Sequence, residues 1–315
     1  MTGDATQPAA KPPTSSPMAL DPRTAGILIF VTALVFGSVH NGLSKSLTDD
    51  LPVPLIIWWR YLGLFAIVVP WALWRYGRSA VVPARPRLHV LRGGLTIVSS
   101  LSFLVAVSGM PLADTMAIVF VYPFIITALA PLLLREHVKL SMWMAVLSGF
   151  LGVLIVMRPG FAEVDVYALL ALLTGATFAL VLLITRMLSV AAPPTVTATW
   201  TATIGILVLS LALPFIWVTP SLEQLALLVI LSIFAATSQL MTMQAFSKAG
   251  AAVLAPFGYS EIVTATAVGF VMFADLPDVV TWLGILLIVA SGVYIAIAGR
   301  PIKLPLLARS RTPGA

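Results

Sequence analysis

Residues 113–134 read ADTMAIVFVYPFIITALAPLLL, an apolar stretch whose one charged residue, Asp114, stands at its start. At ~1.5 Å per residue, about 20 helical residues cross a bilayer core of ~30 Å. The stretch is therefore predicted to be a transmembrane helix. Pro123 and Pro131 lie inside it, and each removes a backbone donor and kinks a helix. Neighbouring helices are expected to satisfy the carbonyls that these prolines free.

Comparable stretches recur along nearly the whole chain of 315 residues, which is 60% hydrophobic and 10% charged, with a mean hydropathy of +1.05. Soluble domains are about half apolar and about a quarter charged, so this composition indicates a multi-span membrane protein. We predict an all-α polytopic membrane protein with ten transmembrane helices. Their ranges are Ala25–Leu43, Pro54–Leu73, Gly94–Gly109, Ala113–Leu134, Trp143–Met157, Tyr167–Ile184, Val196–Val218, Ala226–Phe246, Ala249–Ala274 and Val279–Ala298.

The charged residues predict the orientation of these spans. If the N-terminus is cytoplasmic, most of the 18 basic residues fall on the inner side, whereas most acids fall outside and Arg60 and Glu261 lie within helices. Cytoplasmic loops carry an excess of Lys and Arg, so both termini are predicted to be cytoplasmic. This distribution explains the sequence pI of about 9.9 without a nucleic-acid partner. The basic residues assigned to the inner side are Lys11, Arg23, Arg75, Arg78, Arg85, Arg87, Arg92, Arg135, Lys139, Arg186, Lys248, Arg300, Lys303, Arg309 and Arg311.

The two halves of the chain contain similar sequence motifs. Residues 120–128 read FVYPFIITA and residues 257–265 read FGYSEIVTA, so that Phe, Tyr, Ile, Thr and Ala recur in register. Five spans per unit is an odd number, so the second unit is expected to insert upside down relative to the first. The basic segment Arg135–Lys139 and its acidic counterpart Asp275–Asp278 agree with this inversion. Two inverted five-helix repeats around a central cavity are a physical route to alternating access.

Several motifs carry a family resemblance. Residues 111–120 (PLADTMAIVF), 130–138 (APLLLREHV) and 149–153 (GFLGV) resemble the EamA-type repeat of the drug/metabolite transporter superfamily, and residues 269–278 (GFVMFADLPD) resemble the corresponding segment of a second copy. Two departures are Phe36-Gly37, where the family often has Trp-Gly, and Asp275, where Glu is commoner.

The resemblance implies a domain organisation and a location. It divides the chain into a first EamA-like repeat at 25–158 and a second at 166–298. A disordered cytoplasmic tail at 1–24 and a basic cytoplasmic tail at 299–315 flank them. A bacterial inner-membrane protein that moves metabolites such as amino acids, nucleosides, vitamins or drugs is implied.

Two ionisable residues within the spans are candidates for the site. Glu261 lies about twelve residues into its span, near the bilayer midplane, where an ionisable group is costly and usually faces a cavity or a partner. It is either a carrier of protons or cations or a structural carboxyl. Arg60 either holds a carboxylate or phosphate of the substrate with its planar donor fork, or extends outward towards Asp49 or Asp50.

Other polar and aromatic residues complete the candidate site, with helix packing as the alternative role for each. His40 and Asn41 lie in the first span. The third and eighth spans, which are equivalent in the two repeats, contain several hydroxyl and amide side chains. Aromatic side chains offer a surface on which a planar substrate stacks. The candidates are His40, Asn41, Ser99, Ser102, Gln239, Tyr122, Tyr259 and Trp200. With three His and no Cys in the chain, neither a metal site nor a cofactor is expected.

The predicted function is secondary transport of a small organic metabolite by alternating access, driven by a proton gradient through Glu261 or by the substrate gradient. No GxxxxGK[ST] motif for ATP binding occurs. One alternative is a flippase for lipids or lipid-linked sugars. Another is an intramembrane enzyme, for which no nucleophile elbow or HExxH motif is found, so we predict a protein that is not an enzyme. The expected partners are the small-molecule substrate, protons and membrane lipids, and the oligomeric state is left open.

Overall fold

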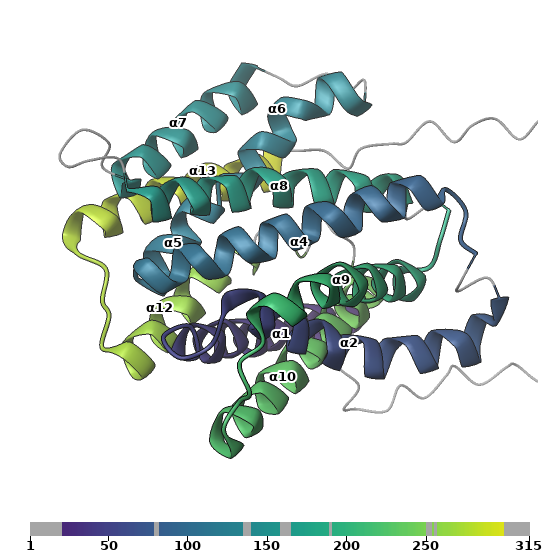
Figure 1. The fold of residues 1–315 in the computed structure, drawn as a ribbon. Coiled ribbons are helices and arrows are strands. Elements are labelled where there is room, and N and C mark those ends of the chain that lie inside the picture. Colours follow the sequence, from purple (N-terminus) through teal and green to yellow (C-terminus); the bar gives the residue numbers. More distant parts are fainter. Residues whose placement is uncertain are drawn as a thin grey trace, which may run out of the picture.

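The computed structural model describes residues 21–78, 82–134, 140–157, 165–188, 191–249, 254 and 257–298. All regular elements in these ranges are helices, as predicted (Figure 1). They are α1 (Pro22–Ser46), α2 (Val53–Tyr76), α4 (Pro86–Gly109), α5 (Leu112–Val119), α6 (Tyr122–Leu134), α7 (Leu140–Met157), α8 (Val166–Leu188), α9 (Pro194–Ile216), α10 (Leu222–Lys248), α12 (Ser260–Phe273) and α13 (Val279–Ala298). The predicted tails lie outside the described residues, apart from the last few residues of the first.

The described helices have the length and composition of membrane spans. Eight segments are long and apolar enough to cross a bilayer, and Leu112–Leu129 counts as one of them. Two shorter apolar helices, Ser260–Phe273 and Val279–Ile295, accompany them. Large apolar side chains also point outward, for example Phe215 at 87% exposure and Val271 at 81%. A surface of this kind suits lipid rather than water, so the prediction of a multi-span helical membrane protein is confirmed.

The predicted helix at 113–134 is divided into two. Helix α5 ends at Val119, Phe120 and Val121 form a turn, and α6 begins at Tyr122. The cause is Pro123, which has no N–H to donate to the Val119 carbonyl and whose ring clashes with a helical residue four positions earlier. Gly175 of α8 packs directly against this carbonyl: a Cβ on Gly175 would lie 2.7 Å from the Val119 oxygen and 2.5 Å from Val121 Cγ1.

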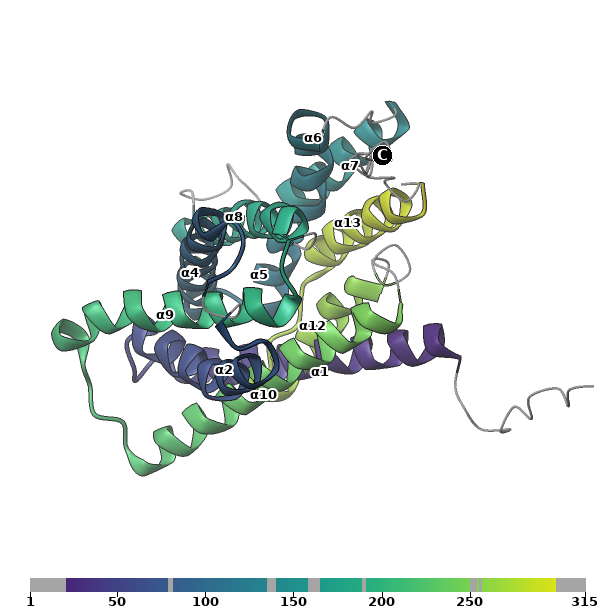
Figure 2. The same cartoon turned by 90° about the vertical axis from the view of Figure 1, so that its right-hand side faces the viewer.

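The two halves of the chain are interleaved. The most extensive helix contacts pair a helix from before residue 158 with one from after residue 165, namely α1 with α10, α4 with α8, α7 with α13, and α2 with α9. Further contacts of this kind join α2 to α10, α4 to α9, α1 to α12, and both α5 and α6 to α8. Figure 2 shows α9 crossing above α2, with α1 and α10 below and α8 beside α4. A space between these helices is therefore bounded by both halves.

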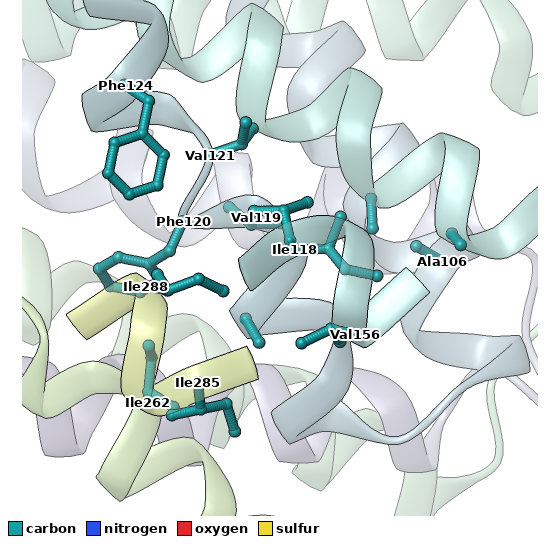
Figure 3. Packing of buried hydrophobic residues seen from close by; sticks show 14 of the residues in the cluster. Ala106, Ile118, Val119, Phe120, Val121, Phe124, Val156, Ile262, Ile285 and Ile288 are labelled. Carbon is teal, nitrogen blue, oxygen red and sulfur yellow. The ribbon is translucent and has the colours of Figure 1, made fainter. Parts of the chain in front are cut away.

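The largest hydrophobic cluster lies beside the α5–α6 turn (Figure 3). Phe120 and Phe124, each at most 2% exposed, pack with Ile262 of α12 and with Ile285 and Ile288 of α13. Buried aromatic and branched side chains are rigid supports because each makes many close contacts. The cluster therefore holds the turn against α12, where Glu261 is the second residue.

A glycine substitution tests the turn. We predict that Gly175→Ala lowers the thermal unfolding midpoint of the detergent-purified protein, because the added Cβ overlaps the Val119 carbonyl and overpacking costs about 1–3 kcal/mol. Gly94→Ala on α4 is the matched control, since nothing lies within 4 Å of its Cβ position. Equal midpoints for the two variants would contradict this account of the turn.

Candidate functional site

A cavity of about 350 Å³ lies between the interleaved halves. Its walls come from α1, α2, α4, α5 and α6 in the first half and from α8, α9, α10 and α12 in the second. The lining residues are Gly37, His40, Asn41, Arg60, Tyr61, Leu64, Arg92, Thr96, Ser99, Ser100, Phe103, Met116, Val119, Phe120, Tyr122, Thr174, Phe178, Val181, Ala198, Thr201, Ala235, Ser238, Gln239 and Glu261.

The structure brings most of the candidate site residues together at this cavity. The candidates that line it are His40, Asn41, Arg60, Ser99, Tyr122, Gln239 and Glu261. Three others lie elsewhere. Ser102 is buried one turn from Ser99, with its hydroxyl 2.9 Å from Thr174 Oγ1. Tyr259 is buried in the largest hydrophobic cluster, with its ring 5.1 Å from that of Phe120. Trp200 packs against His89, with their ring centroids 5.8 Å apart.

Arg60 points into the bundle rather than outward to Asp49 or Asp50. Its guanidinium donates to Ser100 Oγ on α4 and lies 5.2 Å from the centre of the Tyr61 ring. The Ser100 hydroxyl gives its own hydrogen to the Thr96 carbonyl at 2.7 Å. Ser100 therefore acts as a neutral acceptor, and no carboxylate of the described residues lies within ion-pair distance of Arg60.

His40 lies beside this guanidinium with a defined tautomer. Its Nδ1 is 3.2 Å from the carbonyl oxygen of Leu231 on α10. A carbonyl only accepts, so Nδ1 carries the hydrogen, and Nε2 of the neutral ring is left as an acceptor. His40 also lines a small pocket together with Asn41, Ser44 and Arg60. The imidazole, the amide and the guanidinium therefore form one polar cluster between α1 and α2.

Arg92 is a cavity residue that the sequence analysis assigned to a cytoplasmic loop. Helix α4 begins at Pro86, two turns before the predicted start of this span, so Arg92 lies within the helix. Its Nε donates to Thr185 Oγ1 of α8 at 2.6 Å, and its Nη1 donates to Thr201 Oγ1 of α9. Both hydroxyls already donate to carbonyls of their own helices, at 2.6 and 2.8 Å, so both accept from Arg92.

Glu261 is the one acid among the described residues that line the cavity. The wall also contains an aromatic group, in which Phe120 and Tyr122 lie 5.4 Å apart and Tyr122 meets the edge of Phe178 at 5.1 Å. The site thus combines hydroxyls, two guanidinium groups, one carboxyl and a hydrophobic aromatic face. Small-molecule sites have this composition, with few polar groups set in an apolar wall. No group of three His, Asp or Glu side chains suited to a metal ion is found in the described ranges.

An ion pair joins the ends of helices that line the cavity. Lys45, in the last turn of α1, lies 3.2 Å from Asp275, just after α12. Its ammonium also donates to the Met110 carbonyl after α4 at 3.0 Å and lies 4.7 Å from the centre of the Phe273 ring. One side chain thus connects the ends of three helices that line the cavity.

Comparison with known proteins identifies the family. Two consecutive matches to the EamA-like transporter family cover residues 24–158 and 166–297. The chain belongs to the EamA-like transporter family. The resemblance seen in the sequence motifs is thereby confirmed, and the names of the family and of its members are those of transporters rather than enzymes.

Several members of the EamA-like family are similar to this chain along most of their length. An S-adenosylmethionine uptake transporter of Rickettsia prowazekii is 26% identical over 86% of this chain and 92% of its own. A riboflavin transporter of Rhizobium johnstonii is 28% identical over 88% and 93%. A pseudopaline exporter of Pseudomonas aeruginosa is 25% identical over 89% and 96%. A crystal structure with 19% identity, covering 89% of this chain and all of the other, matches with a TM-score of 0.65 and shows the fold alone.

A cysteine substitution tests which hydroxyls face the cavity. The chain contains no cysteine, so a single introduced thiol is the only site for a thiol reagent. We predict that Thr96→Cys, which lines the cavity and is half-buried, reacts with a water-soluble methanethiosulfonate at least ~10-fold faster than Ser102→Cys. Equal rates, measured by mass spectrometry of the folded protein in detergent, would contradict the placement of the cavity.

Proposed function

We propose that this chain is a secondary transporter that moves a small organic metabolite across the bacterial inner membrane by alternating access. The single observation that carries the proposal is the polar cavity bounded by helices of both halves. Polar and ionisable groups inside a membrane protein usually mark a substrate or ion pathway. Relatives that carry S-adenosylmethionine, riboflavin and pseudopaline support a metabolite as the cargo.

The helix contacts support two inverted repeats of five membrane spans. In this proposal the spans of the first half correspond in order to those of the second, with α5 and α6 together corresponding to α12. Helix α1 is then equivalent to α8 and α4 to α10, so exchanging the two halves turns the contact of α1 with α10 into the contact of α8 with α4. Helices α2 and α9 are equivalent to each other, as are α7 and α13, so the exchange leaves these two contacts unchanged. Interfaces of this kind allow the halves to exchange conformations around a fixed site.

The Lys45–Asp275 ion pair is proposed as an outer latch. In the predicted orientation, with both termini cytoplasmic, the end of α1 and the end of α12 lie on the outer side. Because Lys45 also binds the end of α4, separating these helices requires its contacts to break. A pair with side-chain exposures of 15% and 33% is partly shielded from water, so it favours the closed outer face without locking it.

Glu261 is proposed as the residue that couples transport to protons. It lies at the start of α12, adjacent to the aromatic wall, and no described residue forms an ion pair with it. Acidic residues inside membrane spans mark proton relays in pumps and transporters. Proton binding at this position would change the charge of the cavity during the cycle.

Reconstitution tests the proposed transport. We expect vesicles that contain the purified protein to accumulate at least one metabolite from a bacterial extract, compared with protein-free vesicles, when their contents are analysed by mass spectrometry. S-adenosylmethionine and riboflavin, the compounds that relatives carry, are added as labelled probes. The transport proposal fails if the folded, correctly inserted protein enriches no compound, with or without a pH gradient.

Substitution of Glu261 tests proton coupling. We predict that Glu261→Gln abolishes the pH dependence of the accumulation found above, because the amide cannot exchange a proton. Glu223→Gln is the matched control, since Glu223 is exposed in the first turn of α10. Unchanged pH dependence in Glu261→Gln would eliminate Glu261 as the coupling residue while leaving the transport proposal intact.

A further inference from the structure

We propose that the cavity binds the oxyanion group of an organic acid, a carboxylate or a phosphate, at two positions, one at Arg60 and one at Arg92. This inference rests on the proposed transport function and names the chemical class of its substrate. Its evidence is the charge balance of the cavity and the way in which the two guanidinium groups are held.

The ionisable side chains of the described residues that line the cavity have a net positive charge. The described residues that line the cavity include two arginines and one acid, Glu261. The ion pair found among the described residues joins Lys45 to Asp275, so neither cavity arginine has a carboxylate within ion-pair distance there. A cation inside a membrane protein is costly unless a partner compensates it. A negatively charged group of the substrate is such a partner.

The hydroxyl partners orient the guanidinium groups and leave donors free. A guanidinium has five N–H donors. The described contacts engage one donor of Arg60, with Ser100, and two of Arg92, with Thr185 and Thr201. Each hydroxyl gives its own hydrogen to its own helix and accepts from the arginine. The planar fork of each arginine is therefore held in place with donors available for an incoming oxyanion, which it matches in geometry.

The two arginines lie at different depths along the cavity. Ser100, which binds Arg60, and Arg92 both lie on α4, eight residues apart, a rise of ~12 Å along the helix. In the predicted orientation Arg60 is nearer the outer end and Arg92 nearer the inner end. An oxyanion can thus interact with a guanidinium at each end of the cavity, while a planar portion of the substrate meets Phe120, Tyr122 and Phe178 between them.

Inorganic phosphate and acetate are probes that do not require the natural substrate to be known. The unfolding midpoint of the purified protein is measured while sodium phosphate, or in a second arm sodium acetate, replaces sodium chloride at constant ionic strength. The wild-type midpoint should rise with the logarithm of the probe concentration above the dissociation constant, because a ligand that binds only the folded state stabilises it by RT ln(1 + [L]/Kd). The arm in which this rise begins at the lower concentration indicates whether phosphate or carboxylate is preferred.

Four variants separate this site from a general salt effect. Arg60→Gln and Arg92→Gln should each weaken binding of the probe at their own position at least ~10-fold, the loss expected for a charge-assisted hydrogen bond, and should each reduce the rise of the midpoint. Arg75→Gln is the control, because Arg75 is an exposed cation at the end of the same helix as Arg60. Arg92→Lys keeps the charge and replaces Arg92→Gln if that variant fails to fold. Because it loses the planar donor fork but not the charge, it should lose less affinity than Arg92→Gln.

The outcomes distinguish the two proposals. A rise of the midpoint that is equal in wild type, Arg60→Gln and Arg92→Gln would overturn the oxyanion site, because phosphate also stabilises proteins by exclusion from their surface. A rise of the midpoint that depends on both arginines, without metabolite accumulation in vesicles, would support the oxyanion site and reject transport. Accumulation of neutral or cationic metabolites alone would support transport and overturn the oxyanion site.

Discussion

The cost of placing charge in a membrane is the constraint on which this structure depends. Arg60, Arg92 and Glu261 lie on predominantly apolar helices, and none of them can face lipid without a large penalty. The bundle therefore closes around a polar space, and hydroxyls such as Ser100 and Thr201 line it to receive the guanidinium hydrogens. The same constraint that requires the cavity supplies the groups with which a substrate would interact.

The halves of the chain contribute jointly because their helices are interleaved. Arg92 of the first half is held by Thr185 and Thr201 of the second, and His40 by the Leu231 carbonyl. A movement of one half relative to the other must therefore change the cavity itself. The Val119 carbonyl freed by Pro123 lies against Gly175, so even the broken span depends on a helix from the opposite half.

The sequence predicted the helical membrane architecture because apolar stretches of bilayer length need no tertiary information to be recognised. It also placed Glu261 and Arg60 in spans, since a lone charge in such a stretch is conspicuous. It missed Arg92 because the predicted span began at Gly94, after the charge, whereas α4 begins at Pro86. A proline at the first position of a helix is a signal that would have moved this boundary.

Other misplacements arose from packing, which a linear pattern does not contain. Ser99 and Ser102 are one turn apart and equally polar, yet only Ser99 lines the cavity while Ser102 bonds to Thr174. Trp200 and Tyr259 pack against His89 and Phe120 instead. The split of the span at 113–134 follows from Pro123, which was recognised as a kink but produces a complete break.

Alternating access requires one cavity to open to each side of the membrane in turn, and the accessibility of Ser238→Cys, on the α10 wall, measures this opening. The rate of its reaction with a membrane-impermeant thiol reagent is measured in right-side-out and inside-out vesicles, alone and combined with Asp275→Asn. We expect reaction from both sides, with Asp275→Asn raising the rate from outside and lowering it from inside. Reaction from one side only, unaffected by loss of the Lys45–Asp275 pair, would contradict alternating access.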